Sequence, residues 1–286
     1  MFEYNESLEQ ALHRNVEDAL REDIGRTDWT AQLVTTDRRI RARVIAKESA
    51  VIAGQPWFSA CILRLDPTAS IEGLVAEGGT VATGKELVRL EGDAQALLSA
   101  ERSALNFLQM LSGVATATHR YVERIADVSP NPKGCAMLDT RKTMPGLRQA
   151  QKYAVRVGGG VNHRMALWDG ILIKENHIAA AGGIKEALER ARQLGTDVPV
   201  QIEVENLAEL EEALAAGATS VLLDDFTLDD MHRAFALNAG RALLEVSGGV
   251  DWESLQAIAS TGIDRISSGK LTKDVRAIDL SMRFDT

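Results

Sequence analysis

Cysteine is scarce in this sequence, which holds only Cys61 and Cys135 among its 286 residues. The two are not arranged as a CxxC pair, and no histidine stands near either at the spacing of a zinc-ligand set. We therefore expect neither disulfides nor a zinc site, and a reducing, cytoplasmic location.

Long hydrophobic runs are also missing. No stretch of about 18 apolar residues occurs, which excludes an ordinary transmembrane helix. The first residues, "MFEYNESLEQALHRNVEDAL", have neither the basic start nor the apolar centre of a secretion signal. The expectation is a protein that is neither exported by a visible signal nor inserted in a membrane.

Positive charge is in short supply overall, because the formal net charge is -9 and the pI is about 5.2. Such a chain lacks the extended basic face that nucleic acids require. One stretch departs from this balance: from Leu138 to Lys174 seven cations face two acids, for a local charge of +5. A basic island in an acidic protein predicts a small anionic ligand.

The first part of the sequence combines helical and β-type segments. Ser7 and Gln10 form a capping-box pattern, after which apolar residues recur at helical spacing. From Ile40 to Leu90 short β-type runs alternate with glycines, which predicts a small sheet domain. The stretch "ALLSAERSALNFLQMLSGVATATHRYVERIA" then predicts a long helical connection, broken into two helices near Gly113.

After Pro132 short apolar runs alternate with helical segments. The predicted strands are "CAMLDT", "GILIKE", "VPVQIEVE", "SVLLDD", "ALLEVSGG" and "RISSGK". The later helical segments end in glycines, where a C-cap needs a left-handed residue: Gly195, Gly217, Gly240 and Gly262. Because six βα units are fewer than the eight of a closed barrel, we expect an incomplete β/α barrel, with an open doubly wound sheet as the alternative.

Polar, charged or glycine-rich residues follow every one of these strands. In parallel α/β architectures the carboxyl ends of the strands meet at one face, so six such ends in series favour a functional pocket over solvated loops. These strand ends are Thr140-Arg141-Lys142, Lys174, Glu203, Asp224, Ser247-Gly248-Gly249 and Ser268-Gly269-Lys270. The glycine-rich loop "VGGGVNHR" adds His163 and Arg164 near the basic island.

The residue types at these ends indicate the ligand. Ser-Gly-Gly and Ser-Gly-Lys turns expose backbone N–H groups and, next to helix N-termini, would hold phosphate. The four cations Arg141, Lys142, Arg164 and Lys174 could clamp carboxylates or a pyrophosphate. Glu203 and Asp224 would serve sugar hydroxyls, a cationic centre or a divalent metal, and a metal held by two carboxylates and phosphates would be magnesium.

The motifs "LDTRKTMPGLR", "GGGVNHR", "DGILIKENHI", "IEVEN", "LLDDF", "LEVSGG" and "LTKDVRAIDLSMRF" together resemble those of quinolinate phosphoribosyltransferases. The resemblance runs from about "REDIGRTDWT" to the C-terminus. It implies an N-terminal α/β sandwich domain of residues 1–113, joined by residues 274–286, and a six-stranded incomplete β/α barrel of residues 114–273. It also implies a homodimer with an active site at each subunit interface.

The resemblance carries the family's site residues over to matching positions. Arg141, His163, Arg164 and Lys174 would hold quinolinate, with Lys142 beside them, and Arg102 would reach in from the partner subunit. Glu203 and Asp224 would lie near the ribose of phosphoribosyl pyrophosphate, and the turns Ser247-Gly248-Gly249 and Ser268-Gly269 would bind phosphate. Two departures are Asp225, where relatives commonly have Asn, and Lys273-Asp274, where many have His-Ser, so the roles of Asp225 and Lys273 stay open.

The implied reaction, in de novo NAD biosynthesis, joins quinolinate to the phosphoribosyl group and yields nicotinate mononucleotide, CO2 and pyrophosphate, with magnesium accompanying phosphoribosyl pyrophosphate. Two other hypotheses remain. Lys174 in a barrel mouth could be the nucleophile of a Schiff-base aldolase, or the pocket could bind a nucleotide without catalysis.

Overall fold

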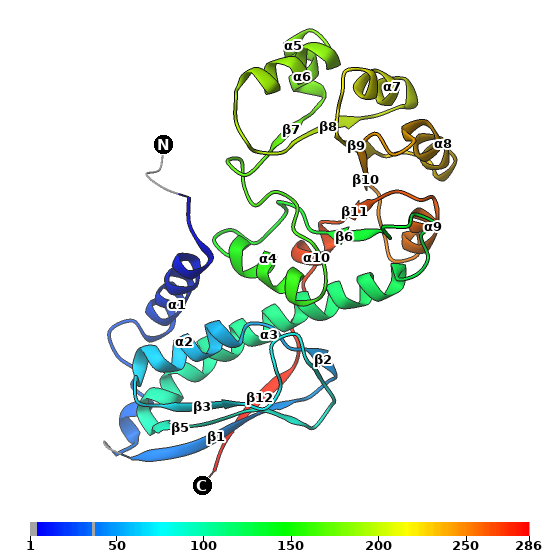
Figure 1. Cartoon of the computed structure of the whole chain (residues 1–286). Helices are drawn as coiled ribbons and strands as arrows, with labels where there is room; N and C mark the ends of the chain where they lie inside the picture. Colours follow the sequence, from blue (N-terminus) through cyan, green and yellow to red (C-terminus); the bar gives the residue numbers. More distant parts are fainter. Residues whose placement is uncertain (1–4, 36–37, 286) are drawn as a thin grey trace. The chain divides into compact units, whose positions relative to one another are not determined.

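A computed structural model of the chain describes residues 5–35 and 38–285 (Figure 1). Its internal contacts divide the chain into two compact units. The first unit comprises residues 1–119, 143–159 and 271–286, and the second comprises residues 120–142 and 160–270. This division places residues 114–119, 143–159 and 271–273 in the first unit, whereas the predicted limits place them in the barrel domain.

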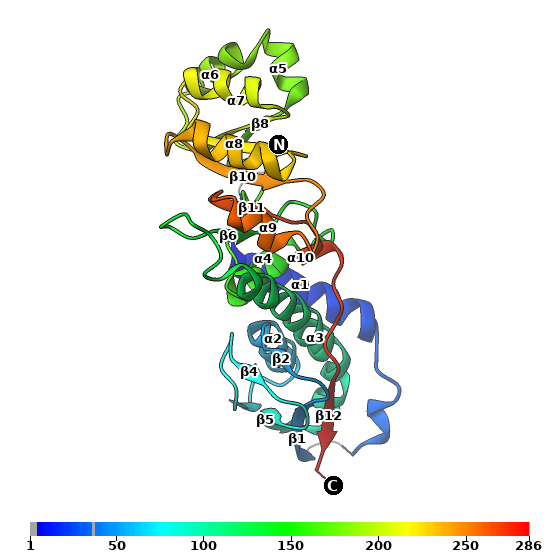
Figure 2. The same ribbon diagram turned by 90° about the vertical axis from the view of Figure 1, so that its right-hand side faces the viewer.

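The first unit is built on an antiparallel sheet of four strands in the order β12-β1-β5-β3. Along β1 (Arg39–Ala46) exposed arginines alternate with buried Ala42, Val44 and Ala46, so only one face of this strand is apolar. Figures 1 and 2 show α3 lying along one face of the sheet. The other strands of the unit are β3 (Ser70–Gly73), β5 (Glu86–Asp93), β12 (Leu280–Phe284) and the short pair β2 (Ala50–Val51) and β4 (Thr80–Val81).

The helices of the first unit begin with α1 (Leu8–Ile24). Its capping box is formed as predicted, since Ser7 Oγ accepts from the Gln10 N–H and Gln10 Oε1 accepts from the Ser7 N–H. Trp57 and Phe58 of α2 are at most 1% exposed and form part of the core. The remaining helices are α2 (Gln55–Leu65), the 3-10 turn η1 (Ala31–Leu33), α4 (Arg148–Val157) and α10 (Lys270–Lys273), whose first residue belongs to the second unit.

The long helical stretch is a single helix, α3 (Ala94–Ile125), so the predicted break near Gly113 is wrong. Gly113 serves a close approach instead. A Cβ at this position would collide with the carbonyl oxygen of Arg276 and lie 3.3 Å from the Cα of Ala277. The glycine therefore lets the chain that leads to β12 cross the helix backbone, a contact that the sequence pattern could not reveal.

The second unit contains six parallel strands in the order β6-β11-β10-β9-β8-β7, which form an incomplete barrel. Each predicted strand is present, and β6 and β7 are the two edges. Figure 1 shows α6, α7, α8 and α9 on the outer side of the curved sheet. The strands are β6 (Ala136–Leu138), β7 (Ile171–Ile173), β8 (Val200–Val204), β9 (Ser220–Asp224), β10 (Leu243–Ser247) and β11 (Arg265–Ser267).

The helices of the second unit follow the strands as the βα pattern requires. All four glycines predicted to end helical segments have positive φ angles, from 61° at Gly195 to 94° at Gly262. No helix in residues 5–35 or 38–285 has both the length and the hydropathy to cross a bilayer. Besides the end of α3, the helices are α5 (Glu175–Ala181), α6 (Ile184–Gln193), α7 (Leu207–Ala215), α8 (Leu228–Asn238) and α9 (Leu255–Ser260).

Candidate active site

The end of β6 is tied to the glycine-rich loop by a buried carboxylate. Asp139 is fully buried; its Oδ1 accepts from the backbone N–H of His163 at 2.9 Å and its Oδ2 from Asn162 Nδ2 at 2.5 Å. Thr140 Oγ1 accepts from the Lys142 N–H at 3.0 Å. Asp139 therefore keeps the end of β6, which carries Arg141 and Lys142, next to the loop that carries Arg164. The sequence analysis did not select this acid as a site residue.

The loop that carries Arg164 is closed on itself. Arg164 Nη1 donates to the carbonyl oxygen of Gly170 at 3.0 Å, and the Met165 N–H donates to Asp169 Oδ2 at 2.6 Å. Burial, with the neighbouring charge of Arg141, lowers the pKa of the Arg164 guanidinium below its usual range. Two guanidinium groups close enough to repel each other are stabilised by an anion between them, so this is the expected carboxylate-binding region.

Lys174 and Glu203 meet at the ends of β7 and β8. Lys174 Nζ lies 2.5 Å from Glu203 Oε2, and the two side chains are 45% and 13% exposed. The structure therefore joins a residue expected to bind quinolinate to one expected near the ribose. Glu203 orients the Lys174 ammonium but also competes with any anionic ligand for its charge.

Asp224, at the end of β9, lies in an acidic environment. Burial raises the pKa of its carboxyl group, and the charges of Glu203 and Asp225 raise it further, while Lys174 and Lys142 act in the opposite direction. Asp225 follows with a left-handed backbone (φ 51°). A cationic group or a hydrated metal ion placed near these carboxylates would relieve their repulsion.

The glycine turns after β10 and β11 lie against these same side chains. A Cβ at Gly248 (φ 81°) would collide with Asp225 Oδ1 and lie 3.1 Å from Asp224 Oδ1. A Cβ at Gly269 would lie 2.9 Å from Lys142 Cδ, so the second turn is beside the β6 end. The positive φ of Gly248 favours glycine at the first turn, whereas the flexible Lys142 side chain could move away from a Cβ at Gly269.

The helix N-termini expected at these turns are present at only one of them. α10 begins directly after Gly269, although it has only four residues. The expectation was wrong for the first turn, because α9 begins at Leu255, six residues beyond Gly249. Any phosphate at this turn would be bound by the backbone of the turn itself.

Two further polar residues lie in strands β8 and β10 and were missed. Gln201 Nε2 donates to Glu245 Oε2 at 3.0 Å, and His163 Nε2 lies 2.9 Å from Gln201 Oε1. Each precedes a predicted site residue by two positions, Gln201 before Glu203 and Glu245 before Ser247, and so shares its face of the strand. A polar residue at that spacing within an apolar strand was the signal that could have found them.

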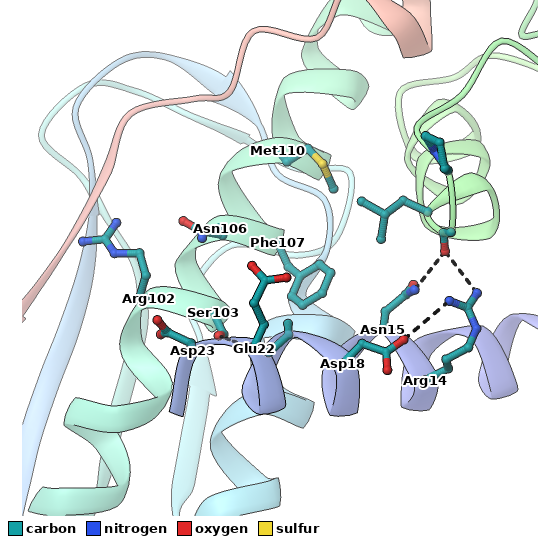
Figure 3. A pocket seen from close by; sticks show the side chains of 14 residues that line it. Arg14, Asn15, Asp18, Glu22, Asp23, Arg102, Ser103, Asn106, Phe107 and Met110 are labelled. Carbon is teal, nitrogen blue, oxygen red and sulfur yellow. Dashed lines mark hydrogen bonds and ion pairs between the residues drawn. The ribbon is translucent and has the colours of Figure 1, made fainter. Parts of the chain in front are cut away.

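Arg102 is in the first unit, whereas the other predicted site residues are in the second. It lines a hollow of about 390 Å³ between α1, α3 and the 145–147 segment, together with Asp18, Glu22, Asp23 and Asn106 (Figure 3). Its side chain is exposed, and it makes no ion pair within the described part of the chain. Lys273, also in the first unit, lies 3.7 Å from Asp274 Oδ1 in an exposed local ion pair.

Comparison with known proteins gives the family of this chain. Residues 28–112 match the model of the quinolinate phosphoribosyl transferase N-terminal domain, and residues 114–283 match that of the C-terminal domain. The chain belongs to the quinolinate phosphoribosyltransferase family. A probable carboxylating nicotinate-nucleotide pyrophosphorylase of Synechocystis is 41% identical over 93% of this chain and 90% of its own, and one of Bacillus subtilis is 41% identical over 91% and 89%.

Two solved structures share the fold over nearly the whole chain. The nicotinate-nucleotide pyrophosphorylase of Francisella tularensis has a TM-score of 0.92 and 43% identity, with 98% of both chains covered. NadC of Streptococcus pyogenes has a TM-score of 0.91 and 37% identity over the same coverage. The incomplete barrel is therefore the correct architecture, and the open doubly wound sheet is not.

Proposed function

We propose that the protein transfers the phosphoribosyl group of phosphoribosyl pyrophosphate to quinolinate and releases nicotinate mononucleotide, CO2 and pyrophosphate. The observation that carries this proposal is the grouping of like charges at the strand ends. Arg141 and Arg164 repel each other, as do Glu203 and Asp224. Such groupings cost free energy, and ligands relieve it: carboxylates neutralise the arginines, and positive charge that develops on the sugar neutralises the acids.

In the proposed reaction the chain acts by orienting substrates and stabilising charge. Arg141, Arg164 and Lys174 hold the two carboxylates, so that the ring nitrogen faces C1 of the ribose. The nitrogen lone pair forms the new N–C1 bond, and the electron pair of the breaking C1–O bond leaves with pyrophosphate. Glu203 and Asp224 stabilise the positive charge that develops on the sugar.

Decarboxylation then follows without a covalent enzyme intermediate. The alkylated ring nitrogen is cationic and draws the electron pair of the bond to the adjacent carboxylate as CO2 departs. A proton takes the place of the carboxylate on the ring carbon. The half-buried Arg141 and Arg164 would hold the second carboxylate and exclude water during this step.

Magnesium is the metal ion that fits the donors. Within the described residues no three acid, histidine or cysteine side chains form a ready metal cluster, so the protein ligands we propose are Glu203 and Asp224, two carboxylates that repel each other at the strand ends. Two carboxylates supplemented by substrate phosphates and water are a donor set typical of Mg²⁺. When bound, the ion would neutralise charge on the leaving pyrophosphate.

The decisive experiment measures pyrophosphate release on mixing quinolinate with phosphoribosyl pyrophosphate and magnesium, with CO2 measured in parallel. Release that requires both substrates supports the transfer, whereas binding without turnover would support the nucleotide-binding alternative. Nicotinate is the matched control substrate, because it lacks one carboxylate and so loses part of its pairing with the cations of the site. Comparable turnover of the two acids would overturn the assignment.

The aldolase alternative is disfavoured by the site. Lys174 Nζ is held by Glu203 Oε2 at 2.5 Å, so its attack on a carbonyl carbon would require this contact to break. Borohydride treatment with a keto acid or sugar phosphate should therefore leave Lys174 unmodified. Trapping of a covalent adduct at this residue would restore the aldolase hypothesis.

We also propose a homodimer in which Arg102 enters the partner's carboxylate site. Its guanidinium is exposed and without an ion pair in the described residues, and Figure 3 shows it pointing away from Arg14 and Asn15 at the other end of the hollow. A two-fold assembly would place two copies of it symmetrically. The cytoplasmic location and the lack of nucleic-acid binding remain predictions.

The dimer proposal is tested by mixing defective subunits. Arg102→Ala and Lys174→Ala homodimers should each be nearly inactive, whereas their tagged and purified heterodimer should regain about half of the wild-type activity from one intact site. Arg21→Ala, an exposed arginine of α1 that pairs with Glu17, is the control that should stay active as a homodimer. A folded heterodimer without recovery would mean that Arg102 serves its own subunit.

A further inference from the structure

His163, Gln201 and Glu245 form a polar chain inside the second unit. Glu245 is fully buried, Gln201 is 7% exposed and the His163 side chain is 15% exposed. A buried carboxylate costs free energy unless it is paired or performs a task. Glu245 Oε1 has no hydrogen-bond partner within the described residues, so packing alone does not explain this acid.

The hydrogen bonds of this chain have a defined direction. The backbone N–H of Arg164 donates to His163 Nδ1 at 2.8 Å, which requires an unprotonated Nδ1 with a free lone pair. The proton of a neutral imidazole is then on Nε2, which donates to Gln201 Oε1 at 2.9 Å. With its oxygen used in this way, the Gln201 amide turns its NH2 group to Glu245 Oε2 at 3.0 Å.

A doubly protonated His163 is incompatible with this arrangement. It would place an Nδ1–H against the Arg164 N–H at 2.8 Å, where two donors repel each other. The 3.6 Å separation of His163 Nε2 and Glu245 Oε1 is longer than a hydrogen bond, so the acid acts through the amide rather than directly. Both ring nitrogens are thereby used within the protein.

The hydrogen bonds among His163, Gln201 and Glu245 also fix the start of the loop that carries Arg164. His163 is held by Asp139 through its backbone and by Gln201 through its ring, and its ring in turn receives the Arg164 N–H. Turning the imidazole would release that N–H and shift the residue whose guanidinium lies near Arg141. A strand side chain therefore controls the geometry of a loop residue.

We propose that Glu245, acting through Gln201, holds His163 as the neutral Nε2–H tautomer and thereby positions Arg164 for anion binding. Gln201 and Glu245 are positioning residues. The expected effect on the KM for quinolinate rests on the proposed transferase function. The tautomer of His163 does not depend on it.

The tautomer itself is measured without turnover. The chain has five histidines, so selective ¹⁵N labelling of the imidazoles gives few signals, and His163→Asn identifies the one sought. Between pH 7 and 8 the wild-type His163 should show a pyridine-like Nδ1 and a protonated, pyrrole-like Nε2. An Nδ1–H tautomer or two protonated nitrogens would overturn the proposal whatever the enzyme's activity.

Variants then test the relay. Gln201→Leu and Glu245→Leu each remove a hydrogen-bonding partner and should raise the KM for quinolinate at least about tenfold, which corresponds to about 1.4 kcal/mol, while the KM for phosphoribosyl pyrophosphate changes less than twofold. Glu245→Gln keeps an acceptor and should retain both the wild-type tautomer and a KM within about threefold. Ile202→Val is the matched control, because it is a buried change on the same strand that leaves the hydrogen bonds of His163, Gln201 and Glu245 intact.

The contrary results are equally defined. If Glu245→Gln is as damaging as Glu245→Leu, the charge rather than the acceptor matters and the relay is wrong. A folded Gln201→Leu protein with unchanged His163 signals and unchanged KM would also contradict it. Absence of pyrophosphate release from the wild type would refute the transferase while leaving the tautomer measurement valid.

Discussion

The sheet of the first unit and the strand ends of the second use charged residues in opposite ways. On β1 and β5 each arginine lies beside an acid: Arg41 Nε is 2.9 Å from Glu91 Oε2, and Arg89 Nη2 is 2.8 Å from Glu86 Oε2. In the second unit Arg164 lies near Arg141, and Asp224 near Glu203 and Asp225. Opposite charges that pair locally indicate a solvated structural surface, whereas like charges held together indicate a ligand.

The largest difference should come from removing one arginine of each kind. Arg141→Ala should weaken quinolinate binding by about 2 to 5 kcal/mol, because the carboxylate loses a desolvated partner. Arg41→Ala should leave binding unchanged and change stability very little, since its pair with Glu91 is exposed. Calorimetric titration and thermal unfolding of both variants measure this contrast.

The two variants, Arg141→Ala and Arg41→Ala, also separate an effect on ligand binding from an effect on stability. Arg141→Ala should relieve repulsion with Arg164, so its loss of quinolinate binding should exceed any loss of stability. A loss of stability in proportion to the loss of binding would mean that the cluster is structural and that the comparison fails.

The Lys174–Glu203 pair is an exception among the strand ends of the second unit, since opposite charges meet there. Lys174→Ala should weaken quinolinate binding by about 2 to 5 kcal/mol, whereas Glu203→Ala should lower turnover with quinolinate affinity largely kept. Because the two groups touch, the double variant should depart from additivity by roughly 1 kcal/mol or more. A double-mutant cycle on kcat and on the quinolinate Kd tests this; equal loss of affinity in both single variants would refute the division of roles.

A smaller effect is expected for stability at Asp224. Its folded-state pKa is raised above the ordinary 3.8, so its ionisation opposes folding as pH rises through the folded pKa. Asp224→Asn should therefore stabilise the protein near pH 8 by less than about 1 kcal/mol after solvent screening, and the gain should vanish below about pH 4. Unfolding temperatures of both proteins across this range test the sign, and a variant that is less stable at pH 8 would contradict it.

The smallest difference is expected for cysteine reactivity, which should be nearly the same in the two units. Burial raises the pKa of Cys61 in the first unit and of Cys135 in the second to about 12, with Asp264 contributing at Cys135. Since only the thiolate is a good nucleophile, both should react slowly with a disulfide reagent at pH 8 in the folded protein and rapidly after unfolding. Fast modification of either native thiol would show that its surroundings are less apolar than the structure indicates.

Much of this architecture could be predicted because local patterns encode it. The six strands of the second unit, the glycine helix ends and the α1 capping box depend on residues close together in the sequence. The predicted break at Gly113 was wrong for the opposite reason. Glycine within a helical stretch suggests a break, but this glycine is required by a contact with Arg276, 163 residues later in the sequence. Residues 143–159 likewise group with the first unit through contacts such as that of Asn15 Nδ2 with the Gly146 carbonyl.

The sequence by itself determined which residue types end each strand, since side-chain direction and strand direction follow from the two-residue and helical periods. Only the tertiary structure decided which of them touch. The pair Lys174–Glu203, the closeness of Asp225 to Gly248 and the chain from Glu245 through Gln201 to His163 all join separate βα units. Hydrogen bonds and ion pairs act over a few ångströms, and barrel curvature, which sets those distances, is a property of the whole sheet rather than of any one segment.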